Sequence, residues 1–513
     1  MLRRLAMTRR GRSRQDNSQV ERSTAYRHLE HFLSPQSVFS EDAVEDIHLS
    51  ALRLLEELGI RILLPEARNL FRGAGARVDD DTQMVRIGRD AVLAAIDAAP
   101  RRTRLRAASV DREQIFAPGR LLFSAGAGCP NCNDIKRGRR PGTLEAYIET
   151  LKLQQGFDVI HKFGPSVEAQ DVPAPFRHYE MTKAQLVTGD KPMFVYSRGR
   201  RQVEECFELI RLALQLSDDD FTDGAWATTI INTNSPRQLD VPMAEGIIDF
   251  ARARQMCIIT PFCLAGAMAP ITPAGALVLQ HAEALACITL SQLARPGAPV
   301  AYGGFSSNVD MKSGAPAFGT PEHVMMTLGS GQLARRIGFP WRSSAGAASN
   351  TADMQAAGET QISLWGAMLA NATLIVHGAG WLEGGLTFGF EKFINDLETL
   401  QTMAELCRAP AADEAGLAWD ALAETEPGGH FFAARHTLAN YRDAFYPPLV
   451  ADLSNFGSWS EAGAKTSTER AVTIWENTLR NHRPPVHAAA AVDRIQPFIE
   501  ERVAGGGAPP SGS

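Results

Sequence analysis

Short apolar segments rich in β-branched and aromatic residues recur eight times through the middle of the chain. A longer stretch with helical periodicity follows each one, and successive segments start 31 to 42 residues apart. Strands that alternate with helices at this spacing favour βα units and a parallel sheet, and eight units in about 250 residues match a TIM-type (β/α)8 barrel. The predicted strands start at Leu121, Val159, Met193, Trp226, Cys257, Pro299, Gly338 and Thr373.

The turn after the first predicted strand distinguishes the barrel from an open doubly wound sheet. An open sheet of that kind usually stops before eight strands and carries a Gly-rich phosphate-binding turn after its first strand. Here residues 126–132 read GAGCPNC, and no helix-opening G-x-G-x-x-G follows them. An α/β barrel is therefore the predicted fold, and we expect the reacting groups to lie where its strands end.

The segments that flank the barrel have different patterns. Residues 1–40 are polar and are predicted to form a flexible tail. Residues 41–115 are predicted to form an α+β cap, because apolar positions follow the helical period and a turn and a short strand come next. The barrel is assigned to residues 116–410, a C-terminal helical extension to residues 411–503, and a disordered Gly- and Pro-rich tail to residues 504–513.

Composition and charge narrow the class of protein. The chain of 513 residues is 44% hydrophobic and 21% charged, so it can bury a large core. A formal net charge of -6 gives no bulk attraction to nucleic acid or to an anionic membrane. No apolar run reaches the roughly 18 residues that span a bilayer, and the Arg-rich N-terminus lacks the apolar stretch of a signal peptide. A cytoplasmic enzyme is expected.

Seven cysteines are too few for a disulfide scaffold in a chain of this length, and they fit a reducing cytoplasm. Cys129 and Cys132 form a C-x-x-C pair after the first predicted strand, a spacing that could hold zinc or act in redox chemistry. A structural zinc would need a second pair, and the sequence has none. We therefore expect ordinary packing for both thiols and predict no metal site.

Aromatic residues outnumber charged ones at the predicted strand ends. A cavity with aromatic walls and few carboxylates suits an organic cation such as a quaternary ammonium, for which each favourable contact is worth roughly 0.5–2 kcal/mol. Any one of these aromatic side chains could instead fill the space between the strands and the helices. The residues at or just past the predicted strand ends are Tyr196, Asn232, Asn234, Phe262, Tyr302, Phe305, Trp341, Arg342, His377 and Trp381.

Several long, Gly-punctuated segments resemble the trimethylamine methyltransferase family. They are TPFCLAGAMAPITPAGALVLQHAEALA (residues 260–286), DMQAAGE (353–359) and LIVHGAGWLEGGLTFGFEKFINDLE (374–398), and RRPGTLEAY (139–147) and INTNSPRQLD (231–240) fit as well. The similarity runs over residues 34–503. It implies a barrel that moves a methyl group from a methylated amine to the cobalt of a corrinoid. A separate small protein would carry that cobalamin-type cofactor, so the chain would hold no tight cofactor of its own.

One departure from the family pattern concerns the residue that activates the amine. Founding archaeal members carry pyrrolysine near the end of the seventh strand, whereas residues 343–355 of this chain read SSAGAASNTADMQ. Pyrrolysine is thought to present an imine to a neutral amine, but a quaternary nitrogen leaves as a neutral tertiary amine without such help. The chain therefore resembles the non-pyrrolysine branch, which includes glycine betaine demethylation, and we do not expect trimethylamine to be its substrate.

Individual residues can then be given provisional roles. His377, which ends the eighth predicted strand, is expected to face the substrate or the cobalt, and Glu383 could balance the cationic nitrogen. Arg342 is a candidate partner for a substrate carboxylate, with a surface or interface ion pair as the alternative. Gln355 lies beside Asp353, which could simply cap a helix. The predicted substrate-binding set is Tyr196, Asn232, Phe262, Tyr302, Trp341, Arg342, Gln355 and Trp381.

Other functions stay open at this level. The methyl acceptor could be a folate instead of cobalt. A barrel lyase or isomerase acting on a small carboxylate would use the same fold, but it would be expected to show a catalytic lysine or a metal cluster at a strand end. Lys162 follows the second predicted strand without an evident partner. A non-catalytic scaffold is the third class. We expect a small-molecule quaternary amine and a corrinoid protein as partners, and assembly into a homo-oligomer.

Overall fold

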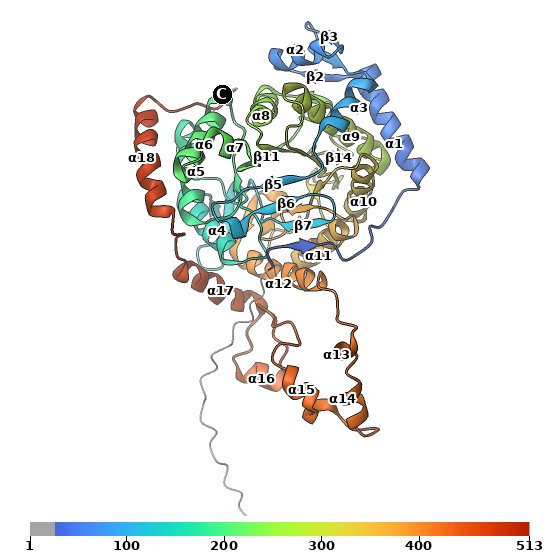
Figure 1. The fold of residues 1–513 in the computed structure, drawn as a ribbon, viewed down its shortest axis with the longest axis vertical. Coiled ribbons are helices and arrows are strands. Elements are labelled where there is room, and N and C mark those ends of the chain that lie inside the picture. Colours follow the sequence, from blue (N-terminus) through green and yellow to red (C-terminus); the bar gives the residue numbers. More distant parts are fainter. Residues whose placement is uncertain (1–25, 512–513) are drawn as a thin grey trace, which may run out of the picture. The chain divides into compact units, whose positions relative to one another are not determined.

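The computed structural model describes residues 26–511, which form two compact units. Residues 26–411 and 448–511 make up the main unit, and residues 412–447 belong to a second unit, which we call the helical insertion. Figure 1 shows strands at the centre of the main unit and helices around them. The first 25 residues of the predicted flexible tail lie outside the described residues.

Seven parallel strands form the central sheet of the main unit, and they coincide with seven of the eight predicted strands. Each is short and buried, as is usual for a parallel sheet covered by helices. A two-residue strand, β1 (Leu29–Glu30), pairs antiparallel with β7 at one edge, although it lies in the predicted tail. The parallel strands, in spatial order, are β7 (Arg120–Phe123), β19 (Leu374–Val376), β18 (Trp341–Ser344), β15 (Val300–Gly303), β13 (Met256–Ile259), β11 (Ala227–Ile231) and β10 (Met193–Phe194).

The second predicted strand, which starts at Val159, is not a strand in the structure. The backbone N–H of His161 donates to the Phe123 carbonyl (2.9 Å) on one side, and the N–H of Phe163 donates to the Pro192 carbonyl (3.0 Å) on the other. The ladder is interrupted here, because the Phe123 N–H donates to Nδ1 of the His161 side chain (2.9 Å) instead of to a carbonyl. Backbone pairing resumes only as an isolated parallel bridge between Cys129 and Val167. The sheet is thus a curled half-barrel in a mixed α/β fold, and a closed barrel of eight strands is not confirmed.

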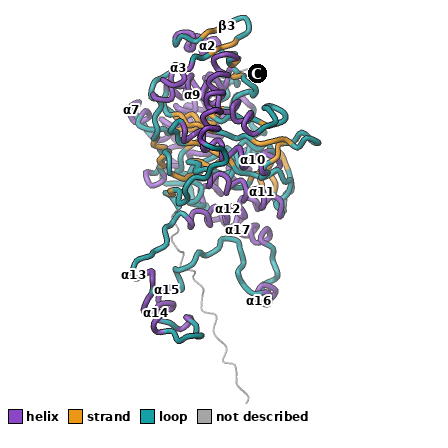
Figure 2. Tube along the Cα trace, turned by 90° about the vertical axis from the view of Figure 1, so that its right-hand side faces the viewer, coloured by secondary structure: helices purple, strands orange, loops and turns teal. Residues whose placement is uncertain are grey.

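Helices follow the strands and cover the outer face of the sheet, as the tube in Figure 2 shows from the side. Several begin with a side-chain cap, such as Asp240 before α8 and Thr272 before α9. The covering helices are α4 (Leu144–Gly156), α5 (Ala174–Thr188), α6 (Arg200–Leu214), α8 (Val241–Arg252), α9 (Pro273–Ala294), α10 (Pro321–Arg336), α11 (Met354–Leu369) and α12 (Phe390–Leu406).

The longest of these helices, α9, is the core helix of the main unit. By length and composition alone it could cross a membrane, but 83% of its most apolar window is buried. It packs against α8 and α10 and against two helices of the N-terminal region, α1 (Glu41–Arg53) and α3 (Arg89–Ala98). A helix in the core of a protein can be as long and as apolar as a membrane-spanning helix. Packing in the core therefore accounts for the length and composition of α9.

The N-terminal region combines short helices and strands. Besides α1 and α3 it contains α2 (Pro65–Gly73) and a small sheet of β2 (Ile60–Ile62), β3 (Arg77–Asp79) and β4 (Met84–Arg86). The sheet is extended by β12 (Gln238–Leu239), which follows the end of β11. The small sheet therefore anchors one of the loops at the carboxyl ends of the central strands.

The C-terminal residues return to the main unit. Helices α17 (Ser467–Asn481) and α18 (Ala488–Ala504) pack on α12 and α4, and on α5 and α6. Residues 505–511 lie in the predicted disordered tail, yet they are held by backbone hydrogen bonds from Ala508 to the Pro175 carbonyl (3.0 Å) and from Ser511 to the Arg198 carbonyl (2.8 Å). These bonds tie the tail to the starts of α5 and α6.

A buried ion pair on α12 gives a test of the packing. Lys392 and Asp396 are salt-bridged one helical turn apart; Lys392 also donates to the Thr360 hydroxyl (2.9 Å), and Asp396 accepts from the Gly380 N–H (2.9 Å). Asp396→Ala leaves a buried ammonium without its partner, so we expect a loss of about 3–5 kcal/mol in the free energy of unfolding. Chemical denaturation of the whole chain measures this loss.

The matched control is Glu57→Ala in the exposed pair between Arg53 and Glu57. Solvent-exposed pairs of this kind contribute little to stability, because water and salt screen the two charges. Equal losses for the two variants would contradict a structural role for the buried pair.

Candidate active site

A cavity of about 330 Å³ opens at the carboxyl ends of the central strands. Each of the seven parallel strands supplies at least one lining residue, in the strand or in the loop that follows it, and Pro165 comes from the extended segment after Val159. The lining is mostly apolar with a few polar groups, as is typical of small-molecule sites. It consists of Ala127, Gly128, Pro130, Pro165, Phe194, Tyr196, Ile230, Asn232, Phe262, Phe305, Arg342, His377, Trp381, Gly384, Gly385 and Leu386.

Six predicted site residues line this cavity. They are Tyr196, Asn232, Phe262, Arg342, His377 and Trp381. Phe305, noted among the strand-end residues, lines it too, whereas Phe194 and Ile230 were missed because they belong to the strands themselves. An alternating pattern of burial would have identified inward-facing strand residues, but these strands are buried on both faces.

Two predicted residues, Tyr302 and Trp341, point away from the cavity. They are register partners on adjacent strands, as are the next residues, Gly303 and Arg342. Because side chains alternate across a strand, Arg342 faces inward and the two aromatic residues face the helices. The Tyr302 hydroxyl lies 3.1 Å from Nδ1 of His281 on α9, and the Trp341 indole donates to the Asn371 carbonyl (3.1 Å). Neither residue is placed to bind substrate.

Gln355 and Glu383 are also outside the cavity lining. Gln355 is exposed on the first turn of α11 and donates to Glu359 (2.7 Å), while Asp353 caps that helix. The carboxylate of Glu383 accepts hydrogen bonds from the Arg139 guanidinium at 2.9 and 3.2 Å. Burial alone would raise the pKa of Glu383, but the bonds from Arg139 hold it below its usual value. Its charge is thus balanced by Arg139, not by a ligand.

Aromatic rings from three loops meet at the cavity. The imidazole of His377 and the indole of Trp381 are stacked, with centroids 4.1 Å apart and planes 11° apart. The Phe305 ring lies 5.3 Å from His377, 5.5 Å from Trp381 and 4.9 Å from Phe262, and it stacks on Phe318 at 5.1 Å. Contacts of this kind fix the rings in place before any ligand arrives.

His377 is held as a neutral ring. Its backbone has φ 62°, a left-handed conformation that is uncommon outside glycine and costs free energy. Nδ1 accepts a hydrogen bond from the Ala127 N–H (3.1 Å), so the neutral imidazole carries its proton on Nε2. Burial, together with the charge of Arg342, lowers the pKa of His377 well below its ordinary value. The ring therefore serves as a fixed, uncharged donor and packing surface.

Arg342 carries a buried positive charge without a carboxylate. The residue is 2% exposed, and Nε and Nη1 have no hydrogen-bond partner among the described residues. Nη2 lies 3.3 Å from Nε2 of His377, which already holds a proton and so accepts poorly. The guanidinium also lies 5.1 Å from the Phe305 ring centroid. Burial lowers the pKa of Arg342 to about 9, so the group stays charged at neutral pH.

The loop that carries Asn232 is braced by a residue that sequence reasoning missed. Glu283 is buried in the middle of α9 and accepts hydrogen bonds from the Thr233 hydroxyl, the Ser235 hydroxyl (2.6 Å) and the Arg237 N–H (2.6 Å). Thr233 directly follows Asn232, so the carboxylate fixes the exit of β11. A glutamate inside the apolar run HAEALA was the available signal, since such a group is buried only when it is bonded.

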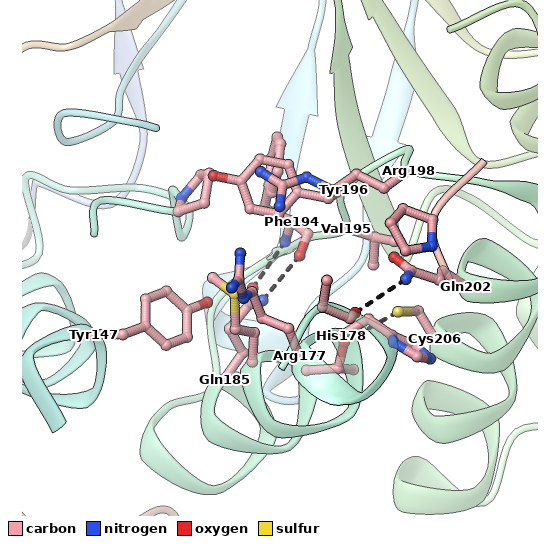
Figure 3. Close-up of a pocket in the computed structure, with 15 residues that line it drawn as sticks. Tyr147, Arg177, His178, Gln185, Phe194, Val195, Tyr196, Arg198, Gln202 and Cys206 are labelled. Atoms are coloured by element: carbon pink, nitrogen blue, oxygen red, sulfur yellow. Dashed lines mark hydrogen bonds between the residues drawn. The ribbon is translucent and has the colours of Figure 1, made fainter. Parts of the chain in front are cut away.

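A second hollow, drawn in Figure 3, lies between β10 and helices α5 and α6. Its volume is about 40 Å³, enough for little more than one water molecule. Gln185 of α5 closes it against the strand by donating to the Phe194 carbonyl (2.8 Å) and accepting from the Phe194 N–H (2.9 Å), both visible in Figure 3. It shares Pro165, Phe194 and Tyr196 with the larger cavity. The hollow is too small for an organic substrate.

The cavity offers no cluster of metal ligands. Within residues 26–511, no group of three or more His, Cys, Asp or Glu side chains could hold a metal ion. Cys129 and Cys132 are free and buried, and burial raises the pKa of both thiols. His377 does not present a free nitrogen to an approaching cobalt, because Nδ1 is bonded to Ala127 and Nε2 faces Arg342.

Comparisons with known proteins agree with the motifs. Residues 7–507 match the family model "Trimethylamine methyltransferase (MTTB)". The chain is 31% identical over 472 residues to a glycine betaine methyltransferase of Desulfitobacterium hafniense strain Y51, covering 92% of this chain and 98% of that protein. It is 28% identical to a trimethylamine methyltransferase of D. hafniense strain DSM 10664 / DCB-2, covering 90% and 93%.

A solved structure, the monomethylamine methyltransferase of Methanosarcina barkeri, is more distant. It shares 12% identity with a TM-score of 0.41, over 91% of this chain and 95% of that one, a likeness too remote to inform the site. The match to the family model, by contrast, extends over nearly the whole sequence. The chain belongs to the trimethylamine methyltransferase family.

Proposed function

We propose that this methyltransferase moves a methyl group from a quaternary ammonium compound to the cobalt of a corrinoid carried by a separate protein. The observation that carries the proposal is the aromatic lining of the cavity, in which Phe262, Phe305 and Trp381 surround a space with no carboxylate among its lining residues. Such a lining attracts a cation whose charge is spread over methyl groups. The relative named for glycine betaine supports the same donor class.

The donor nitrogen is expected to be quaternary because the chain has no group that activates a neutral amine. The position that carries pyrrolysine in founding family members lies in residues 343–355, which contain only ordinary side chains. The backbone there packs on Trp381: a Cβ atom on Gly346 would lie 1.9 Å from the indole ring. No electrophilic side chain extends into the cavity from this loop.

The protein's contribution is positioning and the exclusion of water. The corrinoid, when its carrier protein is bound, supplies the cobalt nucleophile that takes the methyl group. The fixed rings of His377 and Trp381 hold the ammonium in one place. Most of the entropy cost of orienting the methyl group is therefore met on binding, before the methyl group is transferred. Loop residues Gly384 and Gly385 line the cavity, and a Cβ atom on Gly385 would lie 2.5 Å from the Trp381 indole, so glycine at this position lets the ring pack closely on the loop.

We infer that the sheet works as a closed (β/α)8 barrel. The extended segment after Val159 bridges β7 and β10 by one backbone hydrogen bond on each side.

We further propose that the enzyme acts in the cytoplasm as a homo-oligomer. Seven free thiols suit a reducing compartment. The helical insertion supports assembly, because Ala421 is its sole buried residue among those described while Trp419 and Phe432 are 74% and 83% exposed.

The substrate class can be tested directly. With cob(I)alamin as acceptor, we expect glycine betaine or a related quaternary compound to lose one methyl group and trimethylamine to be inert, because a quaternary nitrogen leaves as a neutral amine whereas neutral trimethylamine would have to leave as an amide anion. Formation of methylcobalamin, followed by absorbance, is the measurement. Turnover of trimethylamine alone would contradict the proposed quaternary substrate. Methyl transfer to tetrahydrofolate but not to cobalamin would show that the acceptor is a folate.

His377 provides a test of the cavity. His377→Ala removes the ring that stacks on Trp381, so we expect methyl transfer to fall on the order of 10²-fold because the reacting groups are misplaced. The measurement is the rate per folded molecule, taken together with the melting temperature.

The matched control is His48→Ala, because His48 is equally buried but bonds to His281 on α9, away from the cavity (2.9 Å). This variant should lose stability and keep its rate. A stable, fully active His377→Ala protein would remove His377 from the site.

A further inference from the structure

We propose that Arg342 and Lys162 form an anion subsite at the floor of the cavity, which takes the carboxylate of a zwitterionic betaine. The inference rests on the proposed function for the methyl transfer itself, and adds which quaternary compounds the site selects. Choline and tetramethylammonium carry the same cation without an anion, whereas betaines carry both charges. The subsite therefore defines the substrate class as a quaternary ammonium with a carboxylate on a short tether.

The first observation is that the N–H donors of Arg342 meet no hydrogen-bond acceptor among the described residues. Two of its three nitrogens have no partner among the described residues, and the third faces a protonated nitrogen of His377. Burying an unpaired charge is costly, and proteins normally avoid it by pairing or by binding a ligand. A guanidinium matches a carboxylate with two parallel hydrogen bonds. The missing partner is therefore an anion that enters through the cavity, which Arg342 lines.

Lys162 is a second buried cation, and the charge of Arg342 acts on it. It is 2% exposed, and its ammonium donates to the Phe163 carbonyl (2.8 Å). The ammonium lies 5.4 Å from the ring centroid of Phe194, which lines the cavity. Burial and the charge of Arg342 lower the pKa of Lys162 to about 7. An anion between the two groups would stabilise both charges.

Lys191 shows what a structural buried lysine looks like in the same protein. Its ammonium donates to two carbonyls, those of Gln154 and Phe157 (2.8 Å for the latter). Burial and the charge of Arg112 lower the pKa of Lys191 to about 7, and the carboxylates of Asp158 and Asp190 act in the opposite direction. No described carboxylate has such an influence on Lys162. The difference points to an outside anion for the Lys162 and Arg342 pair.

The position of Arg342 also orients the substrate. Arg342 belongs to strand β18 itself, whereas Phe262, Phe305 and Trp381 lie beyond the ends of β13, β15 and β19. A carboxylate on Arg342 is therefore deeper in the cavity than an ammonium among the rings. This arrangement turns the methyl groups toward the opening, where a docked corrinoid protein can reach them.

Two non-reacting probes test the subsite by calorimetry on the whole chain. The first is 3,3-dimethylbutanoate, which has the shape of glycine betaine and its carboxylate but carbon in place of nitrogen. The second is tetramethylammonium, which has the cation alone. We expect Arg342→Met to weaken 3,3-dimethylbutanoate binding at least about tenfold and Lys162→Met to weaken it less, because each removes a charge-assisted hydrogen bond. Binding of tetramethylammonium should not weaken.

Controls separate binding from folding. Lys191→Met should lower the melting temperature and leave 3,3-dimethylbutanoate binding unchanged, and Lys162→Arg should restore the binding lost in Lys162→Met. Arg342→Met should raise the melting temperature, because an apolar side chain replaces an unpaired buried charge. Failure of wild-type protein to bind 3,3-dimethylbutanoate, or equal binding by Arg342→Met, would overturn the subsite.

The two proposals fail in different ways. If 3,3-dimethylbutanoate binds through Arg342 but no methyl group reaches cob(I)alamin from any betaine, the proposed function is wrong and the subsite stands. If choline and glycine betaine are demethylated equally well, and Arg342→Met changes neither rate, methyl transfer stands and the subsite is wrong.

Discussion

A positive charge that no carboxylate of the described residues balances is buried at the centre of the sheet, and the arrangement of the site follows from it. Arg342 lies on β18 between β15 and β19, so its side chain projects among the strand ends where the cavity begins. The surrounding chain provides the free energy that keeps it there, through a core of short buried strands and of helices packed on them. Because the charge is unsatisfied in the free protein, the cavity is prepared for an anion before one binds.

Three carboxylates around the site hold the backbone of the loops at the strand ends. Glu283 accepts from the Arg237 N–H, Asp396 accepts from the Gly380 N–H, and Glu359 accepts from the N–H groups of Ala348 and Ser349. These three side chains come from α9, α12 and α11 and fix the loops after β11, β19 and β18. The loops are held rigidly while no negative charge faces the cavity, and aromatic faces are left to meet a cation.

The spacing of apolar segments predicted seven of the parallel strands, because alternation of strand and helix is a property of the chain itself. The segment at Val159 had the same composition but formed no strand, since the His161 ring takes the N–H that would have continued the ladder. Register was the second limit. Tyr302 and Trp341 face the helices, whereas Arg342, one residue further along β18, faces the cavity. Where every residue of a strand is buried, the sequence does not show which residues face inward.

Residues beyond the strand ends were easier to place, because the loops after parallel strands converge whatever the register. His377, Trp381 and Phe262 were found in this way. Glu383 was not, because its partner Arg139 lies 244 residues away in the sequence. Glu283 and Lys162 were missed as functional groups for a related reason: a buried charge can be recognised only from the partners around it, and those partners come from other parts of the chain.

The separation of charges in the cavity has a consequence for turnover. When a betaine loses a methyl group, its nitrogen leaves as a neutral amine while its carboxylate keeps its charge, and the amine regains a positive charge only when it takes a proton from water. The contact with the aromatic rings, worth roughly 0.5–2 kcal/mol, is therefore lost in the product, while the contact with Arg342 is kept. The site then binds the product less tightly than the substrate, by an amount set by the rings alone. Placing the reacting cation on aromatic faces and the unchanging anion on Arg342 thus lets one cavity hold the substrate firmly and still release what remains of it.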